Sequence, residues 1–276
     1  MRVVVLVEDY SGYESPFLAQ HGVSFLIEKN GRRLLFDTGQ SAYPVLHNMG
    51  LLGIKPGSID YVFLSHCHYD HTGGLLEILK AIGRRVPVIA HPTLFRRHFV
   101  TRPYLRDVGI PFRREDVEKL AELYLTAEPV EIVEGLWSTG EIRDREDFER
   151  AGIGVYTLKD GKVVEDELLD DMSIVAKTEE GLVVVSGCSH AGIVGIVKHA
   201  VRLTGEEKVG AVIGGFHLID ASEGRIKRTV EEFKKLGVEE VYTGHCTGLR
   251  AESEFMNAYG ENFHKLHSGM VIELRG

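Results

Sequence analysis

Cysteine is scarce in this sequence, and long apolar runs are missing. The 276 residues include three cysteines, Cys67, Cys188 and Cys246, with no closely spaced pair. A disulfide framework therefore does not fit, and a reducing compartment is expected. No apolar run reaches about eighteen residues, and the first ten residues, "MRVVVLVEDY", become acidic too early for a signal peptide. We expect a cytoplasmic protein that does not insert into a membrane.

Positive charge is also in short supply. Lysine and arginine number 32 against 41 aspartate and glutamate residues, for a net charge of -9. This balance argues against a nucleic-acid-binding surface over the whole molecule. The apolar content of 43% is ample for one large core. We expect a single domain over residues 1–276, and the sequence does not indicate an oligomeric state.

Strand and helix patterns alternate along both halves of the chain. Asn30-Gly31 joins two apolar runs and predicts a hairpin. Residues 59–66 form a nearly continuous apolar run, typical of a strand buried on both faces, and are followed by a helical pattern and another strand. The second half repeats this organisation. We predict an α/β fold in which two mixed sheets form a sandwich covered by helices on both outer faces.

Residues 92–129 interrupt the alternation of strand and helix patterns. Four prolines, Pro92, Pro103, Pro111 and Pro129, lie in irregular sequence, and apolar residues at helical spacing predict one helix over 114–127. We interpret this segment as a lid-like insertion in the single domain.

The segment "SHCHYDHTGG" carries the clearest chemical signal. His66 and His68 are two residues apart at a strand end and project to the same side, while Asp70 and His71 approach from the following turn. Imidazole and carboxylate ligands suit zinc, manganese or iron. The four residues predict a metal site with positions open to solvent.

Three later strands also end in glycine followed closely by histidine. These stretches are "VVVSGCSH", "AVIGGFH" and "VYTGH", and they place His190, His217 and His245 at carboxyl strand ends. Ligand sites of α/β sheets assemble at that edge. We predict His190 and His245 as metal ligands and His217 as a catalytic residue, either a terminal ligand or a hydrogen-bond donor to substrate.

These motifs resemble the metallo-β-lactamase superfamily. Its H-x-H-x-D-H signature matches His66, His68, Asp70 and His71, and "LLFDTG" resembles its early strand and turn, which implies that Asp37 supports the site from behind. The resemblance implies an αββα sandwich with one or two zinc ions, or manganese or iron. "TGEI", "SGCSHAGIV", "IGGFHL" and "GHCTG" are similar to the dihydropterin-aminobenzene-phosphate synthase-like branch of metal-dependent hydrolases.

One departure from that family concerns the carboxylate that bridges two metals. Where the family has this carboxylate, the present sequence has glycine and histidine, and Asp220 lies three residues after the expected position. The number of metals therefore stays open. Each cysteine lies within two residues of a predicted ligand. Packing is the expected role of Cys67 and Cys246, whereas the role of Cys188 is left open.

Arginine is concentrated between residues 96 and 114. Six arginines occur there, and we predict Arg96, Arg97 and Arg102 as contacts to an anionic substrate because guanidinium binds phosphate bidentately. The alternative is a solvated surface, or salt bridges to acidic helices.

Together these observations predict a metal-dependent hydrolase. A metal-activated water would attack a phosphorylated or otherwise anionic small molecule, with Asp70 as ligand and possible proton acceptor. One alternative is a transferase that joins a pterin pyrophosphate to an aminoaryl partner, as the resembling branch implies. A metal-bound ligand sensor without turnover is the other.

Overall fold

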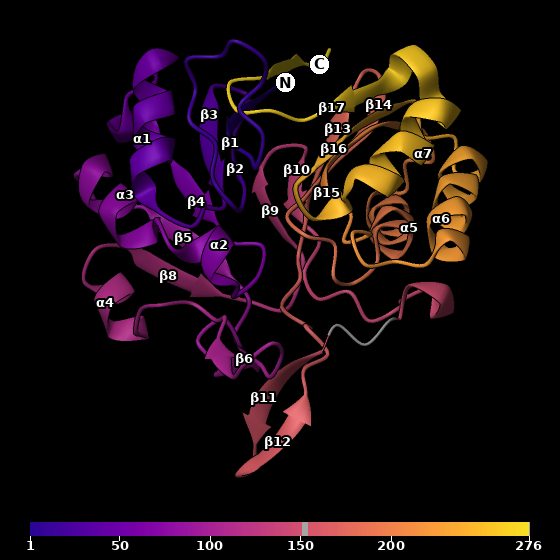
Figure 1. Cartoon of the computed structure of the whole chain (residues 1–276). Helices are drawn as coiled ribbons and strands as arrows, with labels where there is room; N and C mark the ends of the chain where they lie inside the picture. The colour runs from indigo at the N-terminus through magenta and orange to yellow at the C-terminus, as the bar shows by residue number, and fades with distance from the viewer. Residues whose placement is uncertain (151–153, 276) are drawn as a thin grey trace.

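Two mixed β-sheets form the centre of the molecule in a computed structural model that describes residues 1–150 and 154–275 (Figure 1). Within this part of the chain each sheet has seven strands. The first has the order β18 (Val271–Glu273), β1 (Arg2–Val7), β2 (Ser24–Lys29), β3 (Arg32–Phe36), β4 (Tyr61–Phe63), β5 (Pro87–Ala90), β8 (Glu122–Leu125). The second has the order β17 (Phe263–Lys265), β16 (Glu240–Gly244), β15 (Val209–Gly215), β14 (Gly181–Ser186), β13 (Ile174–Thr178), β10 (Leu136–Ser138), β9 (Val130–Val133).

Helices cover the outer face of each sheet (Figure 1). The first sheet carries α1 (Ala42–Leu51) and α3 (Leu75–Ile82), with the short α2 (Tyr69–Thr72) and α4 (Arg114–Glu118) nearby. The second carries α5 (Ile193–Thr204), α6 (Glu223–Lys235) and α7 (Leu249–Tyr259). Single 3₁₀ turns occur at Pro56–Ser58, Asp147–Glu149, His245–Thr247 and Gly260–Asn262. None of the helices in the described residues is long and apolar enough to cross a membrane.

Three apolar clusters correspond to the three interfaces between these layers. One lies between the sheets and includes Phe36, Phe63 and Ile213. The other two lie between each sheet and its helices, around Val62 on one side and Val212 on the other. Alternate residues of a strand point to opposite faces, so both faces of each sheet are buried. The αββα sandwich predicted from the sequence is confirmed.

The predicted turns and strand ends are also present. Asn30 and Gly31 have φ angles of 50° and 74° and connect β2 to β3 as an antiparallel hairpin, as their sequence predicts. Strands β14, β15 and β16 pair in parallel and are linked through α5 and α6. Their carboxyl ends therefore meet at one edge of the second sheet.

Residues 92–129, predicted as a lid-like insertion, contribute strands to two different sheets. Strands β6 (His98–Val100) and β7 (Arg106–Asp107) join β11 (Val155–Lys159) and β12 (Lys162–Glu165) in a small sheet that projects from the sandwich (Figure 1). The predicted helix over 114–127 is wrong beyond its first turn. Only Arg114–Glu118 is helical, and Glu122–Leu125 forms β8 because its backbone extends the first sheet by parallel pairing with β5. Tertiary pairing here overrides local helical spacing.

Removing an aromatic side chain from the helical layer of the second sheet should destabilise the protein strongly. Phe233 is fully buried, with ring centroids 5.5 Å from Phe216 and 5.2 Å from Phe255. Phe233→Ala should lower the free energy of unfolding by about 3–5 kcal/mol, because it leaves a cavity. Urea denaturation measures this change. The control Met256→Ala, at an exposed position of α7, should stay within about 0.5 kcal/mol of wild type; equal effects of the two changes would contradict the packing described.

Candidate metal centre

The candidate centre lies where loops from both sheets meet. The loop after β4 supplies Ser65 to His71, and the ends of β14, β15 and β16 supply Cys188 and His190, His217 and His245. His217 and His245 have positive φ angles of 46° and 48°, a conformation that is uncommon for residues other than glycine. Backbone strain of this kind is typical of functional sites.

Three imidazoles converge on a first candidate cation position. Nε2 of His66 lies 2.9 Å from Nδ1 of His68, which lies 3.2 Å from Nε2 of His190. Burial lowers the pKa of His66 and His190 well below the usual range, and lowers that of His68 to about 3. The three rings are therefore neutral near pH 7, and neutral imidazole is the form that ligates metals.

A second position lies between Asp70, His71, His245 and Cys188. Oδ2 of Asp70 is 3.3 Å from Nε2 of His71 and 3.5 Å from Nε2 of His245. The Cys188 sulfur lies 3.1 Å and 3.3 Å from the same two nitrogens. Burial alone would lower the pKa of His71, but the carboxylates of Asp70 and Asp37 raise it to about 9. A cation bound here therefore has to displace a proton.

The hydrogen bonds around the rings leave a nitrogen lone pair facing each position. Nδ1 of His71 donates to Asp37, and Nδ1 of His245 donates to Asp9, at 2.7 Å in both cases. The Ser65 hydroxyl donates to Asp37 and thereby accepts from Nδ1 of His66. In the neutral rings each Nε2 is then an acceptor directed inward, and at His71 this form requires loss of the proton that its raised pKa retains near pH 7. The donor set fits bound divalent cations at both positions.

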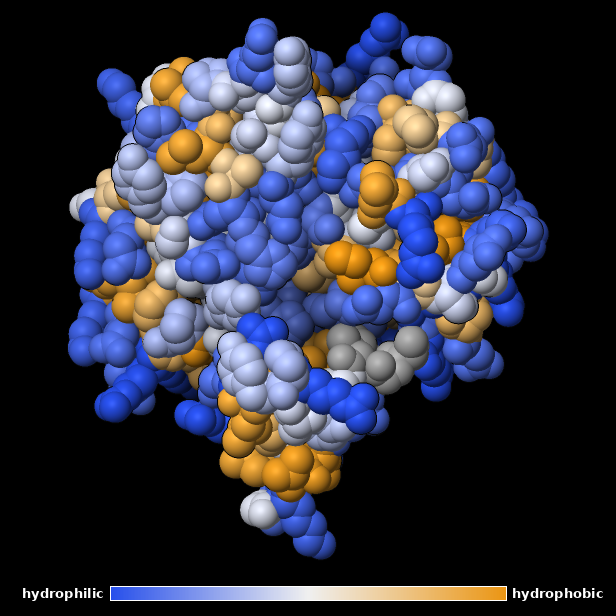
Figure 2. Space-filling view, in the orientation of Figure 1, coloured by the Kyte–Doolittle hydropathy of each residue, from blue (hydrophilic) through white to orange (hydrophobic). Residues whose placement is uncertain are grey.

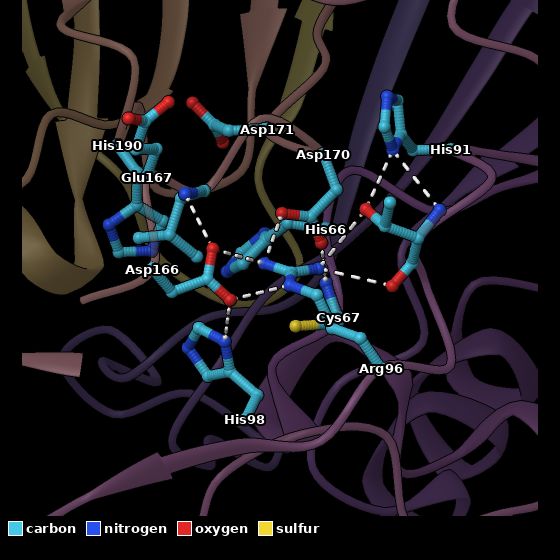
Figure 3. Close-up of polar contacts among 12 residues, drawn as sticks. His66, Cys67, His91, Arg96, His98, Asp166, Glu167, Asp170, Asp171 and His190 are labelled. Atoms are coloured by element: carbon cyan, nitrogen blue, oxygen red, sulfur yellow. Dashed lines mark hydrogen bonds and ion pairs between the residues drawn. The ribbon is translucent and has the colours of Figure 1, made fainter. Parts of the chain in front are cut away.

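His98 and Asp166, whose contact is drawn in Figure 3, orient His68 in the same way. Nε2 of His68 lies 2.9 Å from Nε2 of His98, whose Nδ1 lies 2.9 Å from a carboxylate oxygen of Asp166. Because Asp166 only accepts, His98 donates to it and accepts from His68, which leaves Nδ1 of His68 free for a cation. His98, Asp166 and Asp9 were not predicted as site residues, because none of them lies in a sequence motif.

The arginines predicted as substrate contacts lie elsewhere. Arg96 forms ion pairs with Asp166 and Asp170 inside the protein, and Asp170 accepts a hydrogen bond from the backbone nitrogen of Cys67 (Figure 3). Arg97 pairs with Asp107 on the surface, and Arg102 is exposed. None of these three arginines is among the residues that line the cavity at the metal positions. Arg96 and Arg97 do form salt bridges, as the alternative in the sequence analysis expected, but their partners lie in a loop and in β7 and not on helices.

A cavity of about 730 Å³ opens at the two positions. Figure 2 shows the hollow on this face, surrounded largely by hydrophilic residues. Besides several of the predicted ligand residues, Arg106 of β7 and Arg225 of α6 line it. The segment 92–129 thus borders the cavity, but through Val100, Arg106 and Val108. His217 also lines the cavity, with its ring centroid 4.3 Å from that of His190.

Known proteins resemble this chain over its whole length. A family model described as the metallo-beta-lactamase superfamily matches residues 19–245. The 7,8-dihydropterin-6-methyl-4-(beta-D-ribofuranosyl)-aminobenzene-5'-phosphate synthase of Methanocaldococcus jannaschii is 48% identical, covering 99% of this chain and 96% of that protein. An uncharacterised protein of the same organism is 34% identical over 98% of this chain and 99% of its own length. The crystal structure of Tm1679, a metal-dependent hydrolase of the beta-lactamase superfamily, covers 100% of both chains with 29% identity and a TM-score of 0.86.

Replacing Asp37 by asparagine should weaken cation binding without removing any ligand. Asparagine keeps the size of the side chain and tolerates the φ of 56° found there, but it cannot accept three hydrogen bonds as the carboxylate does. We expect about a 10–100-fold loss of zinc affinity, measured by competition with a chromophoric chelator. Asp116→Asn, on the exposed α4, is the control. Wild-type affinity in Asp37→Asn would show that the carboxylate does not orient the ligands.

Proposed function

The chain belongs to the metallo-beta-lactamase superfamily, and from this premise we propose that it is a synthase that joins a dihydropterin-6-methyl group to a ribofuranosyl-aminobenzene 5'-phosphate. It is an enzyme, as its sequence predicts. The observation that carries the synthase assignment is the 48% identity, along 99% of the chain, to the M. jannaschii protein of that name. The transferase alternative of the sequence analysis is therefore preferred to the hydrolase.

The reaction proposed is a substitution at the carbon attached to the pterin ring. The aminobenzene nitrogen forms a bond to this methylene carbon, and the bond from the carbon to a pyrophosphate oxygen breaks. The electron pair leaves with the pyrophosphate, and the amine loses a proton to a base. Bound zinc, or manganese or iron, would supply positive charge to the pyrophosphate oxygens.

The protein's own residues would hold the cations and the reacting groups. His66, His68 and His190 would hold one cation, and Asp70, His71 and His245 the other. Asp70 is also the proposed proton acceptor, since it lines the cavity. His217, which lines the cavity beside His190, is the second proposed catalytic residue.

Two arginines on the cavity wall are suited to the phosphate groups of these substrates. The side chains of Arg106 and Arg225 form no ion pair or hydrogen bond within the described residues, apart from the attraction of Arg225 to Glu149. Nε of Arg225 is buried without a hydrogen-bond partner there. Arg225 lies in the first turn of α6, whose N-cap residue Ser222 also lines the cavity. A guanidinium at a helix N-terminus favours a phosphate.

Product analysis tests the synthase assignment. The purified protein, loaded with zinc or manganese, is incubated with the 6-hydroxymethyl-dihydropterin pyrophosphate and the aminobenzene ribofuranosyl phosphate. We expect the coupled product and one pyrophosphate per product, with no pyrophosphate released when the amine is omitted. Release that requires only water would overturn the synthase and establish a hydrolase.

The hydrolase is the second candidate, because Tm1679, which matches over 100% of both chains at 29% identity, is described as a metal-dependent hydrolase. In that case a cation at the same ligands would activate water toward an anionic small molecule. If neither pyrophosphate release nor product formation occurs, a screen of phosphomonoester, phosphodiester, lactone and thioester substrates separates a hydrolase from the sensor alternative.

Replacing Arg225 by glutamine should weaken binding of the phosphorylated amine substrate. A charge-assisted hydrogen bond contributes about 1.5–3 kcal/mol, so KM should rise roughly 10–100-fold, with a smaller change in kcat. The difference from wild type should disappear with an amine that lacks the 5'-phosphate. Lys227→Gln, at an exposed position of the same helix, is the control. An equal KM increase with both amines would argue against a phosphate contact.

A further inference from the structure

Cys188 lies among the proposed cation ligands and not in an apolar core. It is 3% exposed and belongs to none of the three apolar clusters of the described residues. Cys67, in contrast, is a member of the cluster between the first sheet and its helices. We propose that Cys188 is a cation ligand that completes the second position. The inference rests on the metal-dependent part of the proposed function.

The distances fit a thiolate on the same cation as His71 and His245. The Cys188 sulfur is 3.1 Å from Nε2 of one ring and 3.3 Å from Nε2 of the other. Zinc bonds of about 2.3 Å to sulfur and 2.0–2.1 Å to nitrogen place two tetrahedral ligand atoms roughly 3.5 Å apart. The observed separations are close to this value, and Asp70 provides a fourth ligand atom within the same group.

The same sulfur also lies near His190, a member of the first ligand set. Ligand atoms of Cys188, His190 and His217 all lie within 4.8 Å of one another. Cys188 therefore adjoins residues of both ligand sets.

The backbone before Cys188 explains how the sulfur reaches this place. A Cβ added to Gly187 would lie 2.4 Å from the Ser65 hydroxyl and 3.0 Å from a carboxylate oxygen of Asp37. Only glycine therefore allows the end of β14 to approach the residues that support the site. The close approach brings the next residue, Cys188, against His71.

Charge balance favours the same assignment. Asp70 is the sole acidic residue in the two ligand sets of the described residues, apart from any contribution of Cys188. Two divalent cations with one ligating carboxylate and five neutral imidazoles would leave an excess of positive charge among the ligands, because the carboxylates of Asp37 and Asp9 contact His71 and His245 only at their outer ring nitrogens. A thiolate adds one negative charge. It also favours zinc, iron or cobalt over magnesium or manganese, because sulfur is a soft ligand.

Cobalt substitution of the full-length protein tests this inference. With two cobalt ions bound per chain, the wild type should show the near-ultraviolet absorption of a cobalt–thiolate bond. Cys188→Ser should lose this band and bind the second cobalt at least 10-fold more weakly. Cys67→Ser and Cys246→Ser should keep it; Cys246 is the sharper control, because its sulfur lies 3.5 Å from the backbone oxygen of Cys188.

A measurement on the unmodified protein covers the case in which Cys188→Ser does not fold. X-ray absorption at the zinc edge should show a sulfur neighbour at about 2.3 Å. Absence of sulfur from the wild-type spectrum, failure of the wild type to bind divalent cations, or a cobalt band that survives in Cys188→Ser would overturn the proposal. Neither method uses a substrate, so a failed synthase assay leaves this result unaffected.

Discussion

One carboxylate, that of Asp37, holds the candidate centre in its arrangement. Its oxygens accept hydrogen bonds from the Ser65 backbone, the Ser65 hydroxyl and the His71 ring. Through Ser65 it also sets the proton on His66. The same group therefore orients a proposed ligand of each candidate cation position, from a buried location at the end of β3. Removing its charge would leave several polar groups without partners in a dry environment, which is costly.

Much of this centre could be predicted from sequence because its parts are local or repeated. His66, His68, Asp70 and His71 lie within six positions, and a strand end suffices to bring them together. The later histidines follow three strands that pair side by side in parallel order, so their convergence follows from the fold class. The fold itself could be predicted because its strands are apolar runs separated by clear turn sequences.

The remaining features depend on contacts between residues far apart in the chain. His98 and Asp166 are separated by 68 positions and have no motif of their own, yet they orient His68. Arg96 belongs to a basic segment that looks exposed, but two aspartates from a distant loop enclose it. The helix predicted over 114–127 gave way to β8 because an open sheet edge offered backbone partners. The spacing of apolar residues within one segment does not show which distant strand or side chain the segment will contact.

Strand β6 links the cavity wall to the proposed cation ligands. It begins at His98, which orients His68, and two residues later Val100 lines the cavity. A substrate that shifts this three-residue strand would also shift the hydrogen bond that directs a ligand. Coupling between two binding equilibria is reciprocal, so any effect of the substrate on cation affinity equals the effect of the cation on substrate affinity. With such coupling, the dissociation constant measured for the substrate depends on the cation concentration, and the one measured for the cation depends on the substrate concentration.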